Sequence, residues 1–328
     1  MMRFLLRRAF WFAVTLWAVV TVSFFLMRAV RGGPFSAERS LHPVIERNIE
    51  ARYHLDWPLW KQYLQYVGPL NLDPHGPDFV GGDGSQILGG VLTGDLGPSF
   101  KYRDFTVNDI LGQSLPISMT LGILALLWAI VLGVGSGLFS AVCRGGRLDL
   151  SMRLVATAGI ALPNFVIAGF LVLLLVFGVP LFPVAGWGTP AHFVLPALAL
   201  GAPFAAYISR LTRTGMLEVL SQDFIRTAHA KGLPQKTILL RHALKGGILP
   251  VISYLGPAVA GILTGSLVIE KIFAIPGTGT HFVNSALNRD YTLAMGVTIL
   301  YTALVYSLNT LVDLAYTFLD PRIRLDES

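Results

Sequence analysis

Long runs without charged side chains are the feature of this sequence that most restricts its fold. A helix needs roughly 20 apolar residues to cross the hydrocarbon core of a bilayer. Runs of that length occur at 9–27, 116–143, 154–209, 248–269 and 291–312. Turn residues between Gly178 and Pro190 divide the third run into two. The sequence therefore predicts an all-α membrane protein with six transmembrane helices.

Two other interpretations of these runs are weaker. The chain has 13% charged and 53% hydrophobic residues, which is more apolar than an ordinary soluble globule. A buried helix in a soluble core usually shows a polar stripe, and 248–269 shows none. A cleaved signal peptide is the alternative for 9–27, but that run is long for one and lacks a small-residue cleavage site. We expect a retained first helix.

Basic residues are distributed as expected for a membrane protein. Arg3, Arg7 and Arg8 precede the first run, and the loop after the second holds Arg144, Arg147 and Arg153. Basic side chains near membrane helices favour the cytoplasmic side, so both termini are expected to be cytoplasmic. The net charge of +6 does not indicate nucleic-acid binding, because the basic residues form no patch interleaved with aromatic side chains.

Metal binding and disulfides have little support in the sequence. Cys143 is the single cysteine, and no cysteine or histidine cluster has the spacing of a zinc site. Asp73, His75, Asp78 and Asp83 lie close together, but they lack a calcium-loop spacing and any pair of histidines. A solvated loop is the better interpretation, since Asp and Gly are common in turns.

The segment 28–115 has the composition of an aqueous domain and is expected outside the membrane. Apolar residues at helical spacing predict two short amphipathic helices, one through Val44, Ile49 and Tyr53 and one through Leu59, Tyr63 and Val67. Asp56 precedes the second and is expected to cap it. From Gly68 to Gly97 the chain is rich in Gly, Pro and Asp, which predicts loops.

The segment 210–247 is basic and helix-forming, with glycines that predict a helix, a turn and a second helix on the membrane surface. In the middle of this segment, Phe224, Ile225 and Ala228 are expected to share one face of a helix. That arrangement leaves Arg226 and Lys231 free to meet lipid headgroups or a partner protein. The spacing does not choose between these two contacts.

The sequence holds no motif that would supply energy for transport. It has no P-loop, and Lys236–Thr237 follows Gln235 where the loop requires glycine. The centres of the apolar runs carry no ionisable side chain for a proton relay, and no zinc-hydrolase pattern occurs. Prolines at 163, 196, 203, 250 and 257 either bend helices that line a cavity or are absorbed by neighbouring helices.

Three classes of function remain. A channel or ion-driven carrier fits six helices but leaves the basic segment 210–247 unexplained. A structural membrane anchor for an enzyme complex is the second class. The third is a permease, not itself an enzyme, that takes its energy from a nucleotide site on another subunit.

Several strings support the third class. They are Phe224–Pro234 followed by Arg241–Lys245 and Ile248–Pro250, together with Gly94–Tyr102, Val268–Phe273, Pro276, Gly277, Asp320–Arg322, Gly33–Phe35 and Tyr53–Leu55. The first string resembles the signature loop of ABC importer permeases, in the variant of the peptide and nickel branch. The whole set looks most like the first of the two membrane subunits of oligopeptide importers. The stretch 68–92 looks longer than in that family.

The resemblance implies a type I ABC importer permease with these parts: cytoplasmic N-terminus and first helix 1–27, external domain 28–115, and a core 116–328. The core would hold transmembrane helices at 116–142, 154–178, 193–209, 248–269 and 291–312, with a coupling segment at 210–247. The localisation implied is the bacterial inner membrane.

The resemblance also implies partners and sites. The partners are a second permease subunit, two ATPase subunits that bind ATP and Mg, an extracytoplasmic solute-binding protein and a peptide cargo; no cofactor belongs to this chain. The ATPase contact would be made by Asp223, Phe224, Ile225, Arg226, Thr227, Ala228, His229, Ala230, Lys231 and Gly232. The binding protein would contact the external loop at Ile275, Pro276, Gly277, Thr278 and Gly279, although a tight connector is nearly as good an interpretation of that loop.

Overall fold

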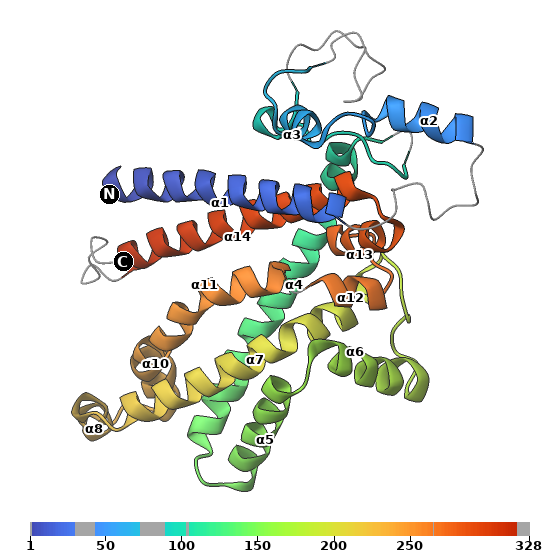
Figure 1. Ribbon diagram of the computed structural model, residues 1–328. Helices are drawn as coiled ribbons and strands as arrows, with labels where there is room; N and C mark the ends of the chain where they lie inside the picture. Colours follow the sequence, from blue (N-terminus) through green and yellow to red (C-terminus); the bar gives the residue numbers. More distant parts are fainter. Residues whose placement is uncertain (1, 30–42, 73–88, 103–104, 265, 320–328) are drawn as a thin grey trace. The chain divides into compact units, whose positions relative to one another are not determined.

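The computed structural model describes residues 2–29, 43–72, 89–102, 105–264 and 266–319, and this part of the chain is helical. Within it no strand occurs, and the extended pairing consists of one bridge between Pro98 and Thr106. The longer helices (Figure 1) are α1 (Met2–Ala29), α2 (Pro43–Arg52), α3 (Leu59–Val67), α4 (Val107–Val142), α5 (Arg147–Ala161), α6 (Asn164–Val172), α7 (Pro190–Leu220), α8 (Asp223–Ala230), α11 (Leu249–Thr264), α13 (Thr278–Asn288) and α14 (Tyr291–Leu319). Shorter helices are η1 (Val91–Thr93), η2 (Leu173–Gly178), α9 (Gln235–Thr237), η3 (Ile238–Ala243), α10 (Leu244–Gly247) and α12 (Ser266–Ile272).

Four described helices are long and apolar enough to cross a membrane: α1, α4, α7 and residues Tyr291–Leu314 of α14. Two bent pairs pass the same test when each is taken as one span. They are Arg147–Ala161 with Asn164–Gly178, bent by 115°, and Gln235–Gly247 with Leu249–Leu263, bent by 53°. The prediction of an all-helical membrane protein is confirmed, with four to six candidate spans among the described residues.

The bend in the first pair has a local cause. Pro163 lacks a backbone N–H, and a proline disfavours helical geometry in the residue before it. Leu162 accordingly takes an extended conformation, with φ −87° and ψ 132°. The uncharged tract 154–178 is therefore two helices with a sharp break between them.

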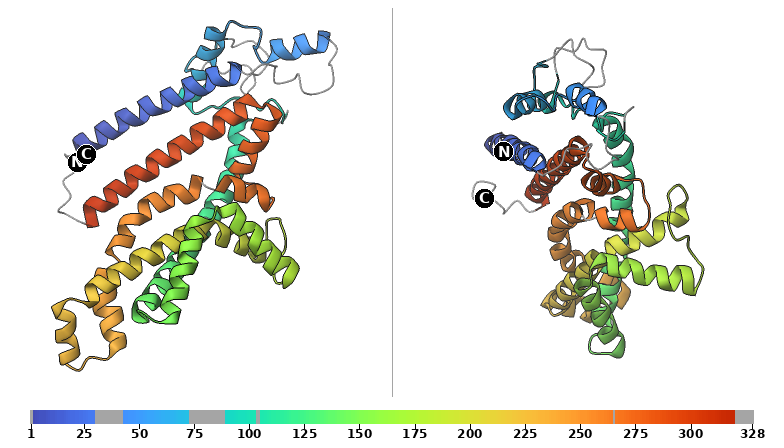
Figure 2. Two further views of the ribbon diagram at one scale, coloured as in Figure 1. Left: turned by 60° about the horizontal axis from the view of Figure 1, so that its bottom comes forward. Right: turned by 45° about the vertical axis from the view of Figure 1, so that its right-hand side comes forward.

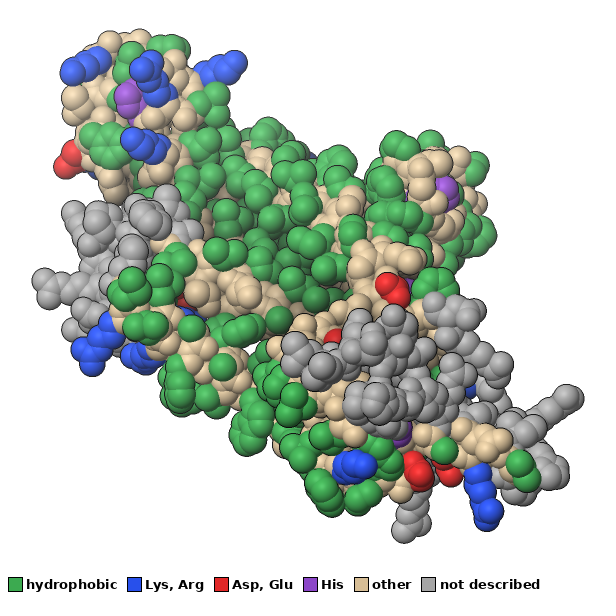
Figure 3. Space-filling model, turned by 90° about the horizontal axis from the view of Figure 1, so that it is seen from above, with side chains coloured by type: hydrophobic (Ala, Val, Ile, Leu, Met, Phe, Trp, Pro, Cys, Tyr) green, Lys and Arg blue, Asp and Glu red, His purple; other side chains and the backbone are tan. Residues whose placement is uncertain are grey.

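Large apolar side chains lie on the surface of these helices, as expected where lipid is the solvent. Phe10, Trp17, Val131, Val155 and Phe170 are each more than half exposed. Figure 3 shows hydrophobic side chains covering much of one face. The hydrophobic side chains are thus not confined to the interior, in contrast to a soluble protein.

The chain forms two compact units, and each is described by itself. The first comprises Met1–Ile117 and Pro276–Ser307; the second comprises Ser118–Ile275 and the last part of α14. In the first unit, α1 packs on α3: the Thr21 and Tyr63 hydroxyls lie 2.7 Å apart, and Arg28 Nε donates to Gln62 Oε1 at 2.7 Å. The middle of α14 lies beside α1 as well, because the Tyr306 hydroxyl donates to the Arg8 carbonyl oxygen.

The two amphipathic helices predicted in the external segment are present as α2 and α3. The prediction that Asp56 caps α3 is wrong. Pro58 occupies the N-cap position, and its carbonyl oxygen accepts from the N–H groups of Lys61 and Gln62. The loop residues Asp73, His75, Asp78 and Asp83 lie outside the described part of the chain, as do Gly33–Phe35 and Asp320–Arg322.

The second unit is organised around α7, against which α5, α6, α10 and α11 all pack (Figure 2). Small residues allow α4 to approach α7 closely. A Cβ atom at Gly133 would lie 2.7 Å from the Ala205 carbonyl oxygen, and one at Gly137 would lie 2.5 Å from that of Ser209. Glycines four residues apart are a common way for membrane helices to pack, since association there depends on close contact. The Ser136 hydroxyl donates to Ser209 Oγ at 2.9 Å across the same interface.

Candidate functional site

The basic segment is helical, as the sequence predicts, and its first part continues α7; its position on the membrane surface stays a prediction. α7 ends at Leu220, α8 runs from Asp223 to Ala230, and Gly232 ends the turn with φ +73°. The N–H of Gly232 donates to the His229 carbonyl oxygen at 2.9 Å, and the N–H of Leu233 donates to that of Ala228 at 3.3 Å. A residue with positive φ that closes the last carbonyls of a helix is most often glycine.

One face of α8 is anchored in an apolar cluster. Ile225 and Ala228 are 2% and 7% exposed, and they pack with Ala141, Met216, Val219, Ile238 and Ala243. The prediction that Phe224 shares the face of Ile225 and Ala228 is wrong for the buried face, because Phe224 is 47% exposed while Ile225 and Ala228 are buried.

The opposite face of α8 is not covered by the described part of the chain. Its exposed residues are Asp223, Phe224, Arg226, Thr227, His229 and Ala230, and the exposed turn continues through Lys231 and Gly232. Arg226 Nη1 and Asp223 Oδ1 lie 3.1 Å apart, with side chains 78% and 92% exposed, so this ion pair contributes little to stability. The exposed face therefore presents the aromatic ring of Phe224 beside Arg226 and Asp223, and the buried face holds α8 against the rest of the unit.

The cluster beneath α8 rests on a crossing of glycines. A Cβ atom at Gly215 of α7 would overlap the carbonyl oxygen of Gly247 in α10. A Cβ atom at Gly247 would lie 2.7 Å from Met216 Sδ, and Met216 is fully buried in the cluster that holds α8. Because backbone meets backbone there, α7 and α10 form a firm base for α8.

The predicted external site at Ile275–Gly279 lies mostly inside the structure. Ile275, Gly277, Thr278 and Gly279 are buried, and Pro276 is exposed. The Thr278 and Tyr301 hydroxyls lie 2.8 Å apart. Contact of this loop with a partner stays a prediction, and Pro276 is the residue of the five most accessible for it.

A buried carboxylate that the sequence did not single out organises the neighbouring loop. Asp290, 1% exposed, accepts hydrogen bonds from Ser99 Oγ, from the Phe100 N–H at 3.2 Å and from the Leu293 N–H at 3.2 Å. It thereby fixes the Gly94–Tyr102 string to the start of α14. Nearby, burial lowers the pKa of the His281 imidazole, whose ring lies edge-on to Tyr102.

Replacing Asp290 by alanine should lower the free energy of unfolding by about 3 kcal/mol, because several buried donors lose their acceptor together. The measurement is thermal unfolding of the full chain in detergent. Asp109→Ala is the control: this exposed carboxylate accepts from Thr106 at the start of α4, and its loss should cost at most about 1 kcal/mol. Equal losses in both variants would contradict the role given to Asp290.

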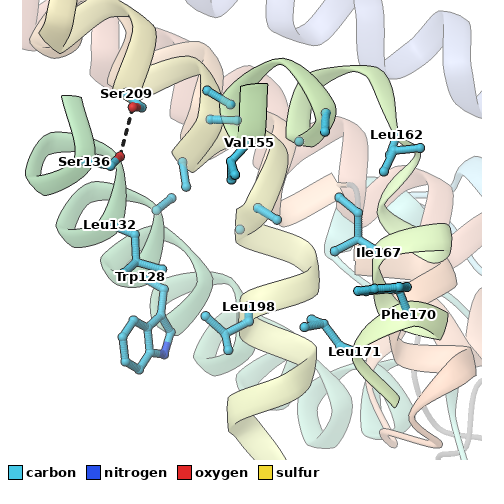
Figure 4. A pocket seen from close by; sticks show the side chains of 18 of the residues that line it. Trp128, Leu132, Ser136, Val155, Leu162, Ile167, Phe170, Leu171, Leu198 and Ser209 are labelled. Atoms are coloured by element: carbon cyan, nitrogen blue, oxygen red, sulfur yellow. Dashed lines mark hydrogen bonds between the residues drawn. The ribbon is translucent and has the colours of Figure 1, made fainter. Parts of the chain in front are cut away.

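An apolar cavity of about 590 Å³ opens between α4, α5, α6 and α7 (Figure 4). Trp128, Leu132, Phe170 and Leu198 contribute to its lining, and no residue of the lining is charged. The hydrogen-bonded pair Ser136 and Ser209 lies at one side. The cavity can accept apolar groups, but it offers no titratable side chain for moving a proton.

Other titratable groups of the second unit are internally bonded. Glu270 is fully buried, and its Oε1 accepts from the hydroxyls of Ser118 and Ser266, each at 2.7 Å. Among the residues the structure describes, no group of three or more His, Cys, Asp or Glu side chains could hold a metal ion.

Comparison with known proteins gives a consistent result along the chain. Residues 129–325 match the family model described as "Binding-protein-dependent transport system inner membrane component". The oligopeptide transport system permease protein OppB of Salmonella typhimurium is 44% identical over 326 residues, covering 99% of this chain and 100% of that protein. The dipeptide transport system permease protein DppB of Bacillus subtilis is 43% identical over 325 residues, covering 99% of each.

Among solved structures, a crystal structure titled as an amino acid ABC transporter with histidines matches with a TM-score of 0.46 and 18% identity, over 63% of this chain and 92% of that chain. The family match extends over more than half of the sequence and includes α8 with its exposed face. The chain therefore belongs to the family of binding-protein-dependent transport system inner membrane components.

Proposed function

We propose that this chain is the transmembrane subunit of an ATP-driven importer and forms half of the pathway for oligopeptides or dipeptides. The observation that carries the proposal is full-length similarity to permeases named for oligopeptide and dipeptide transport, at 44% and 43% identity. The chain is a permease and not an enzyme. The uncharged cavity lining agrees, because it offers no group for ion coupling.

The proposed partners follow from the family. They are a solute-binding protein that delivers the peptide, a second permease subunit, and two ATPase subunits that bind ATP and Mg. The sequence contains no nucleotide-binding loop of its own, which supports placing hydrolysis on separate subunits.

The proposed topology has six spans, both termini in the cytoplasm and an external domain at 28–115. Here the bent pair Arg147–Ala161 with Asn164–Gly178 counts as one span, and the fifth span is 248–269, which begins after the bend at Gly247. The distribution of arginine and lysine supports this orientation, because it places 210–247, with α8, on the cytoplasmic side.

We assign the ATPase contact to the exposed face and turn of α8. The helix is fixed on α7 and η3 through Ile225 and Ala228, so a force applied to its outer face reaches both of those helices. ATP can favour one arrangement of the permease only through contacts that differ between the two arrangements. Phe224 and Arg226 are placed to make such contacts.

Arg226→Glu tests the assignment. The side chain is 78% exposed, so the protein should fold and insert normally, while reversed charge at the contact should abolish ATP-driven peptide uptake into proteoliposomes. Arg144→Glu, an exposed arginine in the loop after α4, is the matched control and should retain uptake. Uptake by the wild-type chain without ATPases would refute the proposed function, and failure of Arg226→Glu to insert would indicate a folding role.

A further inference from the structure

One buried carboxylate joins the ends of α4, α5 and α7 that lie nearest to α8. Asp149 on the first turn of α5 is 1% exposed. It accepts from Ser140 Oγ of α4 at 2.6 Å and from the Gly145 N–H at 3.0 Å. Arg213 of α7 donates to both carboxylate oxygens, through Nε at 2.8 Å and Nη2 at 2.9 Å. Arg153 lies farther away, at 3.6 Å, and is half exposed.

The geometry of the Arg213 contact fixes an orientation as well as a distance. A guanidinium bound to both oxygens of a carboxylate holds the two groups in one plane. Removing one charge of a buried pair leaves the other uncompensated, so neither helix can leave the contact freely. α5 is thereby tied to α7 at the end where α7 leads into α8.

The helix ends that hold Asp149 also hold α8. Ala141 follows Ser140 on α4, and Met216 lies one turn beyond Arg213 on α7; both belong to the apolar cluster that contains Ile225 of α8. A displacement of α8 therefore reaches α4 and α7 first, and it reaches α5 through Asp149.

Elsewhere α5 meets α7 through small apolar groups. A Cβ atom at Gly159 would lie 2.9 Å from Ala206 Cβ, and both residues line the apolar cavity. This contact is made between apolar groups, whereas the ion pair at Asp149 also fixes the orientation of the two side chains. The α5 helix also forms one arm of the 115° bend, so its position sets the width of the cavity between α4, α6 and α7.

We propose that Asp149 and Arg213 are positioning residues that make α5 follow α7 when α8 is displaced, so that movement at the ATPase contact changes the shape of the cavity. The proposal rests on the function proposed above for α8. It adds the route by which α5, tied to α7 at Asp149, takes part in the transport cycle.

The experiment measures ATP hydrolysed per peptide transported by the reconstituted importer. Asp149→Asn should raise this ratio about fivefold or more, the lower end of ordinary coupling between sites. The double variant Asp149→Asn, Arg213→Gln removes both charges, so it should restore the thermal stability lost in the single variant without restoring the ratio. Arg147→Gln, an exposed arginine on the same turn of α5, is the control and should leave the ratio unchanged.

Two results would overturn the proposal. One is a double variant that assembles and keeps the wild-type ratio, since transport would then not need the tie. The other is a double variant that does not assemble with its partners, since the pair would then serve folding alone. Failure of the wild-type chain to bind any ATPase would refute the proposed function instead. Copurification of the ATPases with the wild-type chain therefore separates a failure of the proposed function from a failure of the positioning role.

Discussion

Gly215→Ala is expected to prevent α7 and α10 from packing, and little correctly folded protein should accumulate in the membrane. The added Cβ atom would overlap the carbonyl oxygen of Gly247, which is backbone and has no rotamer to adopt. Overpacking of this kind costs about 1–3 kcal/mol even where side chains can move. The effect should be larger here, because the same crossing carries Met216 and the cluster beneath α8.

Gly135→Ala provides the matched control for this prediction. Gly135 lies inside α4, and a Cβ atom there meets nothing within 4 Å. Alanine should therefore stabilise α4 by about 0.5–1 kcal/mol. Both variants replace glycine by alanine, but the change in stability should be a loss at Gly215 and a gain at Gly135. Thermal unfolding of the detergent-purified chains measures it. Equal stability of the two variants would show that the glycine crossing is not needed.

Gly232→Val is expected to reduce ATP-driven uptake more than tenfold while leaving insertion and thermal stability close to those of the wild type. Space is not the reason, since a Cβ atom at Gly232 meets nothing within 4 Å. The cause is the backbone, because φ is +73° and a β-branched residue strongly disfavours that region. Valine would reopen the turn and change the direction in which α8 presents Phe224 and Arg226.

Gly232→Asn separates backbone geometry from side-chain bulk. Asparagine tolerates left-handed conformations better than other residues with a side chain, so this variant should keep most of the uptake. Uptake is measured in proteoliposomes with binding protein, ATPases and ATP. Equal loss in the valine and asparagine variants would show that the added side chain, and not the turn, blocks transport.

Much of the fold follows from local patterns in the sequence. The apolar runs predict the helices because the length of a membrane span depends on local composition. Gly232 and Gly247 lie where the basic segment turns. A proline such as Pro163 allows either a bent helix or a kink that neighbouring helices absorb, and the sequence does not choose between them. The 115° angle depends on packing against α7. The same limit applies to Phe224, whose exposure depends on which face of α8 meets Met216.

The polar contacts were not predictable from spacing. Asp290 and Ser99 are 191 residues apart in sequence, and Asp149 and Arg213 are 64 apart. No periodicity links such pairs. Asp149 follows the basic loop Arg144–Arg147 and Asp290 follows Arg289, so the sequence alone indicates that both are solvent-exposed. The burial of Thr278 and Gly279 is likewise a tertiary effect, and it narrows the predicted external contact to the neighbourhood of Pro276.

Cross-linking from α8 tests the central claim most directly. Thr227 is exposed on the outer face of α8, and a Thr227→Cys variant in a Cys143→Ser background places one thiol there. In the assembled importer, we predict that this thiol cross-links to an ATPase subunit and that bound ATPase protects it from a bulky maleimide. A transport-active complex in which the thiol reacts freely with the maleimide and cross-links to no ATPase would contradict the account.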